Sequence, residues 1–232
     1  MEKALGLSHP NYTTKLIGPD EVFNFRCRQC ANCCKNVEQS VALEALDIFR
    51  ISRYLKEIGD QFWRIEDILE QYTTLVIITE FGYPFFMANV SGPDDSCIFL
   101  KSGQCSIQNA KPRTCRMYPL TLEPAENGFS YHLIEDSNDH YSGPEIKSAH
   151  WMANSLNPED VAFTKAEFSA AFTTGIIMRE KRDAGVSLTD MLKWVVYFKY
   201  YYYDIEKPFL EQYQSNVKTL ISILGKMKKE AA

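Results

Sequence analysis

Apolar residues recur with a helical period in the first third of the chain. From Ser40 onward they return about every 3.6 residues as far as Ile58, and Gly59 follows as a helix-ending residue. Asp60 is suited to cap a second, shorter helix over residues 61–71. The pattern therefore predicts two consecutive helices before the middle of the chain.

Shorter apolar runs of a different character follow. Residues 75–79 are rich in β-branched side chains, residues 85–90 form a second apolar run, and Gly82 and Pro84 separate the two. Runs of this length around a turn signal predict a β-hairpin. Residues 129–134 are a further candidate strand.

Helical patterns dominate the last third of the chain. Pro158 suits the first position of a helix that we expect to run to about Asp183. Ser187 with Asp190 resembles a capping box that opens another helix. A third helix is expected to begin near Pro208.

Together these patterns predict an α+β protein. A small cysteine-ligated core with short strands is expected over residues 1–150, and a helical C-terminal extension over residues 151–232 is expected to pack on it. The chain has 232 residues, of which 45% are hydrophobic and 24% charged, as in an ordinary soluble globular protein.

Charge and hydropathy exclude several classes of partner. The formal net charge of −5 gives no support for a general nucleic-acid-binding role. The N-terminal residues show no apolar run resembling a signal peptide. The most apolar late stretch, residues 191–203, is interrupted by Lys193 and Lys199 and is too short for a transmembrane helix. We therefore expect a cytoplasmic protein without a nucleic-acid or membrane partner.

Cysteines are the main chemical signal of the sequence, and they fall into two segments. The first cysteine segment holds Cys27, Cys30, Cys33 and Cys34, and the second holds Cys97, Cys105 and Cys115. Thiols stay reduced in the cytosol, where clustered cysteines indicate metal binding or redox chemistry rather than disulfides. Two residues between cysteines let thiolates of one loop converge on one metal centre, as in zinc sites and ferredoxins.

The first segment alone does not complete a known motif. Val37 stands where a bacterial ferredoxin or a radical-SAM motif would place its next cysteine, and Ala31 stands where haem attachment needs His. Further ligands are therefore expected from the second segment. Seven thiols exceed the four that a zinc ion or a cubane needs, so either two metals share thiolates or some cysteines are neighbours of the centre. Cys34 is a ligand or a close neighbour, because adjacent side chains such as those of Cys33 and Cys34 usually diverge.

Both segments carry cations and no acids. The cations are Arg26, Arg28 and Lys35 around the first segment and Lys101, Lys111, Arg113 and Arg116 around the second. Four thiolates around zinc, or around an oxidised cubane, leave about −2 of net charge, which nearby cations would compensate. Arg113 and Arg116 flank Cys115 and are candidate cofactor-binding residues, either as compensating charges or as a clamp on an anionic cosubstrate.

Other interpretations stay open at this point. Free cysteines also behave as small buried hydrophobes, which explains one or two of the seven but not the dense first segment. The odd cysteine count and the expected cytosolic setting argue against disulfides. His132 is the best-placed histidine for a further ligand. The aromatic run over residues 198–203 packs in the core or contacts a protein partner through the helical part.

Both cysteine segments resemble one known family. CRQCANCC, residues 27–34, resembles the CxxCxxCC signature of the YkgJ-like cysteine-cluster family, a zinc- or iron-chelating domain. CIFLKSGQCSIQNAKPRTCRMYPL, which begins at Cys97, looks like the family's second hallmark, with Lys111-Pro112-Arg113 where an Arg-Pro dipeptide is usual. The resemblance covers about residues 23–121 and implies that the seven cysteines serve a metal site.

The resemblance also implies an enzymatic alternative. Some members are labelled flagellin lysine N-methylase, so an iron–sulfur-dependent protein lysine N-methylase is the second hypothesis, with no catalytic residue identified. S-adenosylmethionine would be its cosubstrate, yet the 11 glycines include no G-x-G, which disfavours a Rossmann-type site. Whether the chain is an enzyme stays open. The first hypothesis is a protein that binds zinc or an iron–sulfur cluster through clustered cysteines.

Overall fold

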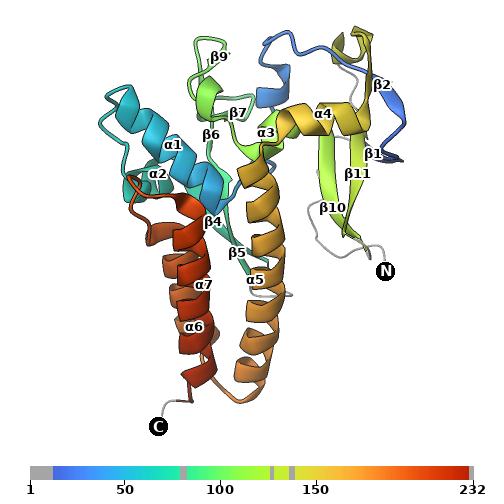
Figure 1. Ribbon diagram of the computed structural model, residues 1–232. Coiled ribbons are helices and arrows are strands. Elements are labelled where there is room, and N and C mark those ends of the chain that lie inside the picture. Colours follow the sequence, from blue (N-terminus) through green and yellow to red (C-terminus); the bar gives the residue numbers. More distant parts are fainter. Residues whose placement is uncertain (1–12, 79–82, 126–127, 136–138, 230–232) are drawn as a thin grey trace. The chain divides into compact units, whose positions relative to one another are not determined.

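The protein consists of two compact units that interleave along the chain. A computed structural model describes residues 13–78, 83–125, 128–135 and 139–229 (Figure 1). The first unit combines the residues up to Ala42 with Ala88–Asn157, and the second combines Leu43–Met87 with the residues from Pro158 onward. The predicted α+β class with a helical C-terminal part is confirmed. The division into residues 1–150 and 151–232 stays a prediction.

Short antiparallel strands are the main regular elements of the first unit. Its largest sheet has the order β1-β11-β10, with β1 at Thr13–Ile17, β11 at Gly128–Glu135 and β10 at Leu120–Ala125. The two-stranded pairs are β2 (Val22–Asn24) with β12 (Glu145–Lys147), β6 (Val90–Ser91) with β7 (Ser96–Cys97), and β8 (Leu100–Lys101) with β9 (Gln104–Cys105). Its helices are η1 (Asn32–Cys34), η2 (Gln108–Ala110), α3 (Arg113–Met117), η3 (Asp139–Ser142) and α4 (Ser148–Ser155).

One apolar cluster supports the first unit, and we call it the Phe25 core. Its buried members are Ile17, Phe23, Phe25, Met117, Leu120 and Met152, with Tyr118 and Trp151 among the residues packed against them. The Phe25 ring lies 5.1 Å from the Trp151 ring and 5.8 Å from the Tyr118 ring, both edge-on. Because Phe25 and Met117 each lie two residues from a cysteine, one core holds both cysteine segments.

Helices dominate the second unit. They are α1 (Ala45–Glu57), α2 (Ile65–Tyr72), α5 (Pro158–Asp183), α6 (Leu188–Val196), the π-helix η4 (Tyr197–Tyr201) and α7 (Phe209–Lys226). A sheet of order β3-β5-β4 accompanies them, with β3 at Ala42–Leu43, β5 at Tyr83–Ala88 and β4 at Thr73–Ile78. The helical core packs Met178 and Val195 against Leu220 and Leu224.

The predicted helices of the last third are confirmed by their caps. Helix α5 begins at Pro158, and the Ser187 hydroxyl accepts a hydrogen bond from the Asp190 amide at 3.3 Å at the start of α6. The hairpin is also confirmed, because β4 and β5 are neighbours in one sheet. Its predicted turn at Gly82 lies outside the described residues.

Two helix starts differ from the prediction. Helix α1 begins at Ala45 rather than near Ser40, because the Ala88 amide binds the Val41 carbonyl at 2.9 Å in the β3 region. Helix α2 begins at Ile65, and Asp60 instead accepts a bond from the Phe62 amide at 2.8 Å in a preceding turn.

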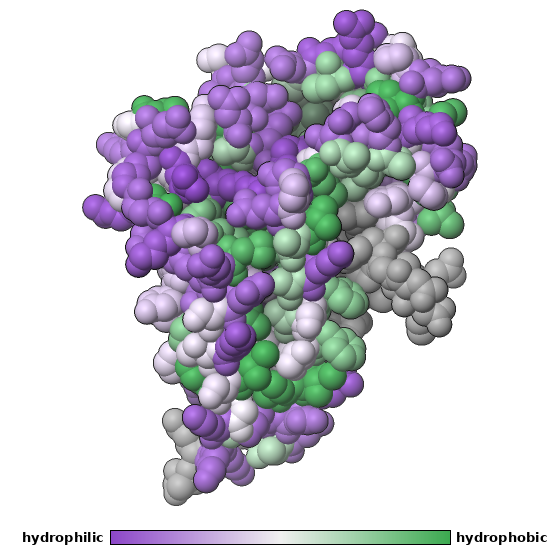
Figure 2. All heavy atoms as spheres, in the orientation of Figure 1, coloured by the Kyte–Doolittle hydropathy of each residue, from purple (hydrophilic) through white to green (hydrophobic). Residues whose placement is uncertain are grey.

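Large apolar side chains are exposed on strands as well as helices, for example Leu16 on β1, Leu75 on β4 and Phe172 on α5. On the face shown in Figure 2, hydrophilic residues dominate and apolar residues gather in patches. Helix α5 is apolar on its outer side as well as its inner side, since Phe172 is 66% exposed while Phe163 is buried. In the described part of the chain, no helix combines the length and hydropathy needed to cross a membrane.

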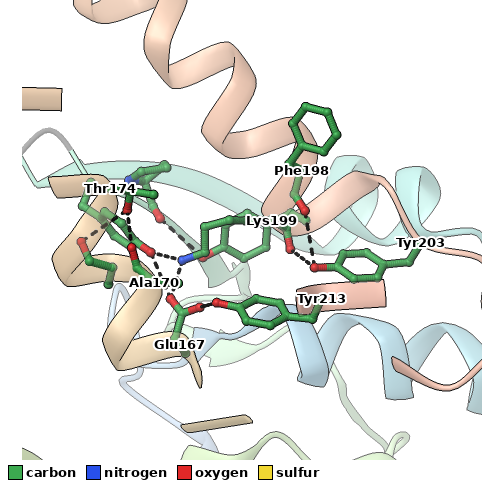
Figure 3. Close-up of polar contacts among 11 residues, drawn as sticks. Glu167, Ala170, Thr174, Phe198, Lys199, Tyr203 and Tyr213 are labelled. Carbon is green, nitrogen blue, oxygen red and sulfur yellow. Dashed lines mark hydrogen bonds and ion pairs between the residues drawn. The ribbon is translucent and has the colours of Figure 1, made fainter. Parts of the chain in front are cut away.

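A buried charged cluster fixes the π-helix within the second unit. Lys199, which is 2% exposed, donates from Nζ to the Tyr83 hydroxyl and to Glu167 Oε1 (Figure 3). The Tyr213 hydroxyl donates to Glu167 Oε2. The Lys199 Nζ also lies 4.2 Å from the centroid of the Tyr83 ring. Every charge in the cluster has a partner, as burial of charge requires.

Replacing Lys199 is expected to destabilise the second unit strongly. Lys199→Ala leaves the largely buried Glu167 carboxylate without its cation, which costs about 3–5 kcal/mol. Lys193→Ala is the matched control. The ion pair that it removes, between Lys193 and Asp190, is exposed to solvent and contributes little to stability. Urea denaturation followed by circular dichroism measures both. Equal urea midpoints for the two variants would show that the ion pair between Lys199 and Glu167 does not contribute to stability.

The same cluster predicts a dependence on acid pH. Burial by itself would raise the pKa of Glu167, but Lys199 and the Tyr213 and Tyr83 hydroxyls together hold it below its ordinary value of 4.5. A lowered carboxyl pKa stabilises the fold at neutral pH, and this contribution is lost as the pH falls below 4.5. The stability gap between wild type and Glu167→Gln should therefore narrow in urea titrations from pH 7 to about pH 3. A constant gap would contradict the prediction.

Candidate metal centre

The first cysteine segment is an irregular loop shaped by left-handed residues. Gln29 and Ala31 have φ values of 52° and 65°, which non-glycine residues seldom adopt. The chain then closes a 3-10 turn, in which the Cys34 amide binds the Ala31 carbonyl at 2.9 Å. As a result Cys33 and Cys34 do not diverge: their side chains hydrogen bond to each other.

The start of this loop is held against the segment that precedes β12. The Phe25 amide binds the Pro144 carbonyl at 3.3 Å, and Arg28 Nη2 donates to Ser142 Oγ at 2.7 Å. Gly143 lies directly against the loop, since a Cβ there would stand 2.3 Å from the carbonyl carbon and oxygen of Phe25. Only glycine allows this approach.

Backbone hydrogen bonds bring the end of the first segment to the second. The Asn36 and Val37 amides bind the Asp94 and Asp95 carbonyls at 2.8 and 3.1 Å. Lys35 adds an exposed ion pair to Asp94 at 3.4 Å. Since Asp94 lies in the turn between β6 and β7, these bonds place the first segment beside the hairpin that bears Cys97.

Two small hairpins and a short helix present the second set of thiols. Cys97 on β7 lies opposite Val90. Ser102 and Gly103 both have positive φ, 50° and 76°, as a two-residue type I′ turn requires. This turn places Cys105 opposite Leu100, and Cys115 follows in the middle of α3.

Five of the seven cysteines line one pocket of about 520 Å³, which we call the thiol pocket. They are Cys33, Cys34, Cys97, Cys105 and Cys115. Lys35 and Lys111 also line it, and of the described lining residues none is Asp or Glu. The remaining two sequence-predicted ligands, Cys27 and Cys30, are exposed and are not among the lining residues.

Three of the five pocket thiols have raised pKa values, which favour their protonated forms. The hydrogen bond with Cys34 raises the pKa of Cys33 far above its ordinary value. Burial raises the pKa of both Cys97 and Cys105. Lys111 acts in the opposite sense on Cys33 and Cys105, because its positive charge favours their thiolates. Metal binding must therefore release protons from these thiols. The positive charge of Lys111 lowers the free-energy cost of that deprotonation.

The two sequence-predicted arginines lie elsewhere, and neither is among the residues that line the pocket. Arg116 donates from Nε to the Lys111 carbonyl at 3.1 Å and from Nη1 to the Ser155 carbonyl at 2.8 Å. Arg113 Nη1 lies 3.5 Å from Met117 Sδ. Their assignment as cofactor-binding residues stays a prediction.

Lys111 lines the thiol pocket, although the sequence offered it only as one of several compensating cations. It belongs to the acid-free second segment, and its place beside the thiols follows from the η2 turn and Pro112. His132, the best-placed histidine in the sequence, instead contacts Ser130 Oγ through Nε2 at 3.1 Å on β11 and is not among the lining residues.

The donor set fits a thiophilic metal, although the thiols are spread around the pocket. Within the described residues no three His, Cys, Asp or Glu side chains already form a group able to hold a metal ion. Thiolates suit zinc and iron–sulfur clusters alike, while hard cations prefer oxygen ligands. The chemistry of the five thiols therefore fits either zinc or iron.

Fold and pocket define a cysteine-rich metal-binding domain of α+β class. Residues 26–139 match the CxxCxxCC family model, described as "Putative zinc- or iron-chelating domain". This match agrees with the family that the two cysteine segments predicted. No curated protein and no solved structure matched the chain.

Gly143 gives a test of how the first segment is held. Gly143→Ala should push the Phe25–Arg26 backbone away and destabilise the first unit by about 1–3 kcal/mol, as overpacking does. The metal content per chain should fall with it. Gly175→Ala is the matched control, because a Cβ there meets open space on helix α5. Urea denaturation and metal analysis measure both effects, and similar behaviour of the two variants would refute the close approach.

Proposed function

We propose that the first unit binds an iron–sulfur cluster in the thiol pocket. The supporting observation is that five thiols share one pocket of about 520 Å³. On the same measure a single water-sized occupant needs only about 10–15 Å³. In a structural zinc site four ligands surround one ion at about 2.3 Å. Such a site would leave most of this volume unfilled. A polynuclear cluster binds thiolates that stand further apart.

Three thiols from both segments are the proposed core of the ligand set. Cys97 interacts electrostatically with Cys33 and Cys105, and Cys105 interacts with Cys33, so these three thiols influence one another across the two segments. Cys34 and Cys115 line the same pocket and are available for a fourth position. Cys27 and Cys30 stay predicted ligands from the sequence, and single variants separate them from the pocket thiols.

An iron–sulfur-dependent enzyme is the second candidate function. Catalytic metal sites keep an open position, and the room in the thiol pocket is the observation that favours one. A protein lysine N-methylase is the activity that the family resemblance suggests, with S-adenosylmethionine as its cosubstrate. A cytoplasmic setting and a protein partner at the helical part belong to this proposal.

The expected outcome of anaerobic purification is a brown protein. Iron and acid-labile sulfide should be found together at about four of each per chain, as in a cubane cluster. Elemental analysis, visible absorption and electron paramagnetic resonance of the reduced protein measure this. A colourless protein with one zinc per chain would overturn the iron–sulfur assignment and leave a zinc site.

Serine variants locate the ligands in the same assay. Cys97→Ser and Cys105→Ser should each lose most of the bound iron, because both remove a pocket thiolate. Cys27→Ser makes the same chemical change at an exposed thiol outside the pocket. This variant should retain at least half of the bound iron. The reverse ranking would place the centre at the start of the first segment instead of in the pocket.

A further inference from the structure

The thiol pocket has a wall chemistry that metal binding alone does not explain. Besides its thiols it is lined by Val41, Phe99, Ile107 and Leu120, all of them buried. A volume of about 520 Å³ lies in the range of small-molecule sites, about 300–1,000 Å³, which combine apolar walls with a few polar groups. The pocket therefore has the size and the lining of a site for an organic ligand.

One cation in this wall lacks a carboxylate partner. Lys35 is paired with Asp94 at the exposed rim. Lys111 forms no ion pair within the described part of the chain, and the groups it acts on are the thiols of Cys33 and Cys105. With no acid among the described lining residues, Lys111 is the charge that an anionic ligand would meet.

We propose that the thiol pocket binds a small monocarboxylate with a short apolar tail beside the metal. Its carboxylate pairs with Lys111, and its tail lies against Val41, Phe99, Ile107 and Leu120. This proposal rests on the proposed function in one respect, that a metal centre is held by pocket thiolates. It goes further in assigning the remaining space to a ligand that the protein does not supply.

Charge selects a monoanion over other ligands. If Cys33, Cys97 and Cys105 supply three thiolates, a carboxylate oxygen at the fourth position gives the same total charge as a four-thiolate site. A dianion such as phosphate would bury an additional negative charge with no second unpaired cation in the described wall. A neutral amide would leave Lys111 without a partner in a partly buried site.

The test compares hexanoate with hexanamide, two probes of equal length that differ in charge. Both are titrated by isothermal calorimetry into the anaerobically purified, metal-loaded full chain, with visible absorption of the centre recorded in parallel. Hexanoate should bind saturably, at least tenfold more tightly than hexanamide, and should shift the absorption. Equal binding of the two probes, or no binding, overturns the proposal.

Lysine variants test the role of Lys111. Lys111→Gln should weaken hexanoate binding at least tenfold without changing hexanamide binding, and Lys111→Arg should recover most of the loss. Lys101→Gln is the matched control, because it removes the same charge from the exposed β8–β9 hairpin and does not line the pocket. A loss of hexanoate binding in the Lys101 variant equal to that in the Lys111 variant would overturn the assignment.

Metal content, measured in the same samples, separates this proposal from the proposed function. Wild type that contains metal but does not distinguish hexanoate from hexanamide refutes the carboxylate site alone. Wild type that contains no metal refutes the proposed function, and the carboxylate site with it. If Lys111→Gln loses its metal, the comparison of the two probes on wild type still decides the question.

Discussion

The candidate site depends on the packing of Phe25 against Tyr118 and Trp151. Phe25 precedes the first cysteine segment and Tyr118 follows the second, so this contact joins two loops that are distant in sequence. The Trp151 indole adds a hydrogen bond to the Met117 carbonyl at 2.9 Å. Bringing such loops together costs conformational entropy, which the buried aromatic area offsets. An apolar core therefore holds together the two loops that present the pocket thiols.

That arrangement bears on the role of the metal. Zinc fingers unfold without their ion because they have almost no core of their own. Here the Phe25 core and the β1-β11-β10 sheet support the unit, and burial keeps Cys97 and Cys105 protonated. The first unit therefore has an apolar core in addition to its cysteines, unlike a zinc finger.

The parts of the fold that local chemistry specifies were predictable from the sequence. Pro158 and the Ser187–Asp190 cap mark the helix starts in α5 and α6. Strand β1 was not predicted, because its partner β11 lies more than a hundred residues away in the sequence. No local sequence pattern indicates this pairing. The left-handed conformation of Gln29 and Ala31 in the first cysteine segment was not predictable, because these residue types carry no signal for it. Lys111 shares an acid-free segment with Arg113 and Arg116, so residue type alone could not predict which of these cations lines the pocket.

Buried Lys199 and partly buried Lys111 differ in how their charges are compensated. The charge of Lys199 is balanced within its own unit by the Glu167 carboxylate. Glu167 is in turn held by a hydrogen bond from the Tyr213 hydroxyl. Lys111 acts on thiols whose pKa values are raised, so in the metal-free state its charge is left without a full counter-charge in the described wall. Thiolates formed on metal binding, or an anion from solution, would supply the missing negative charge. The thiol pocket is thus electrostatically incomplete until it is loaded, whereas the Lys199 cluster is complete as folded.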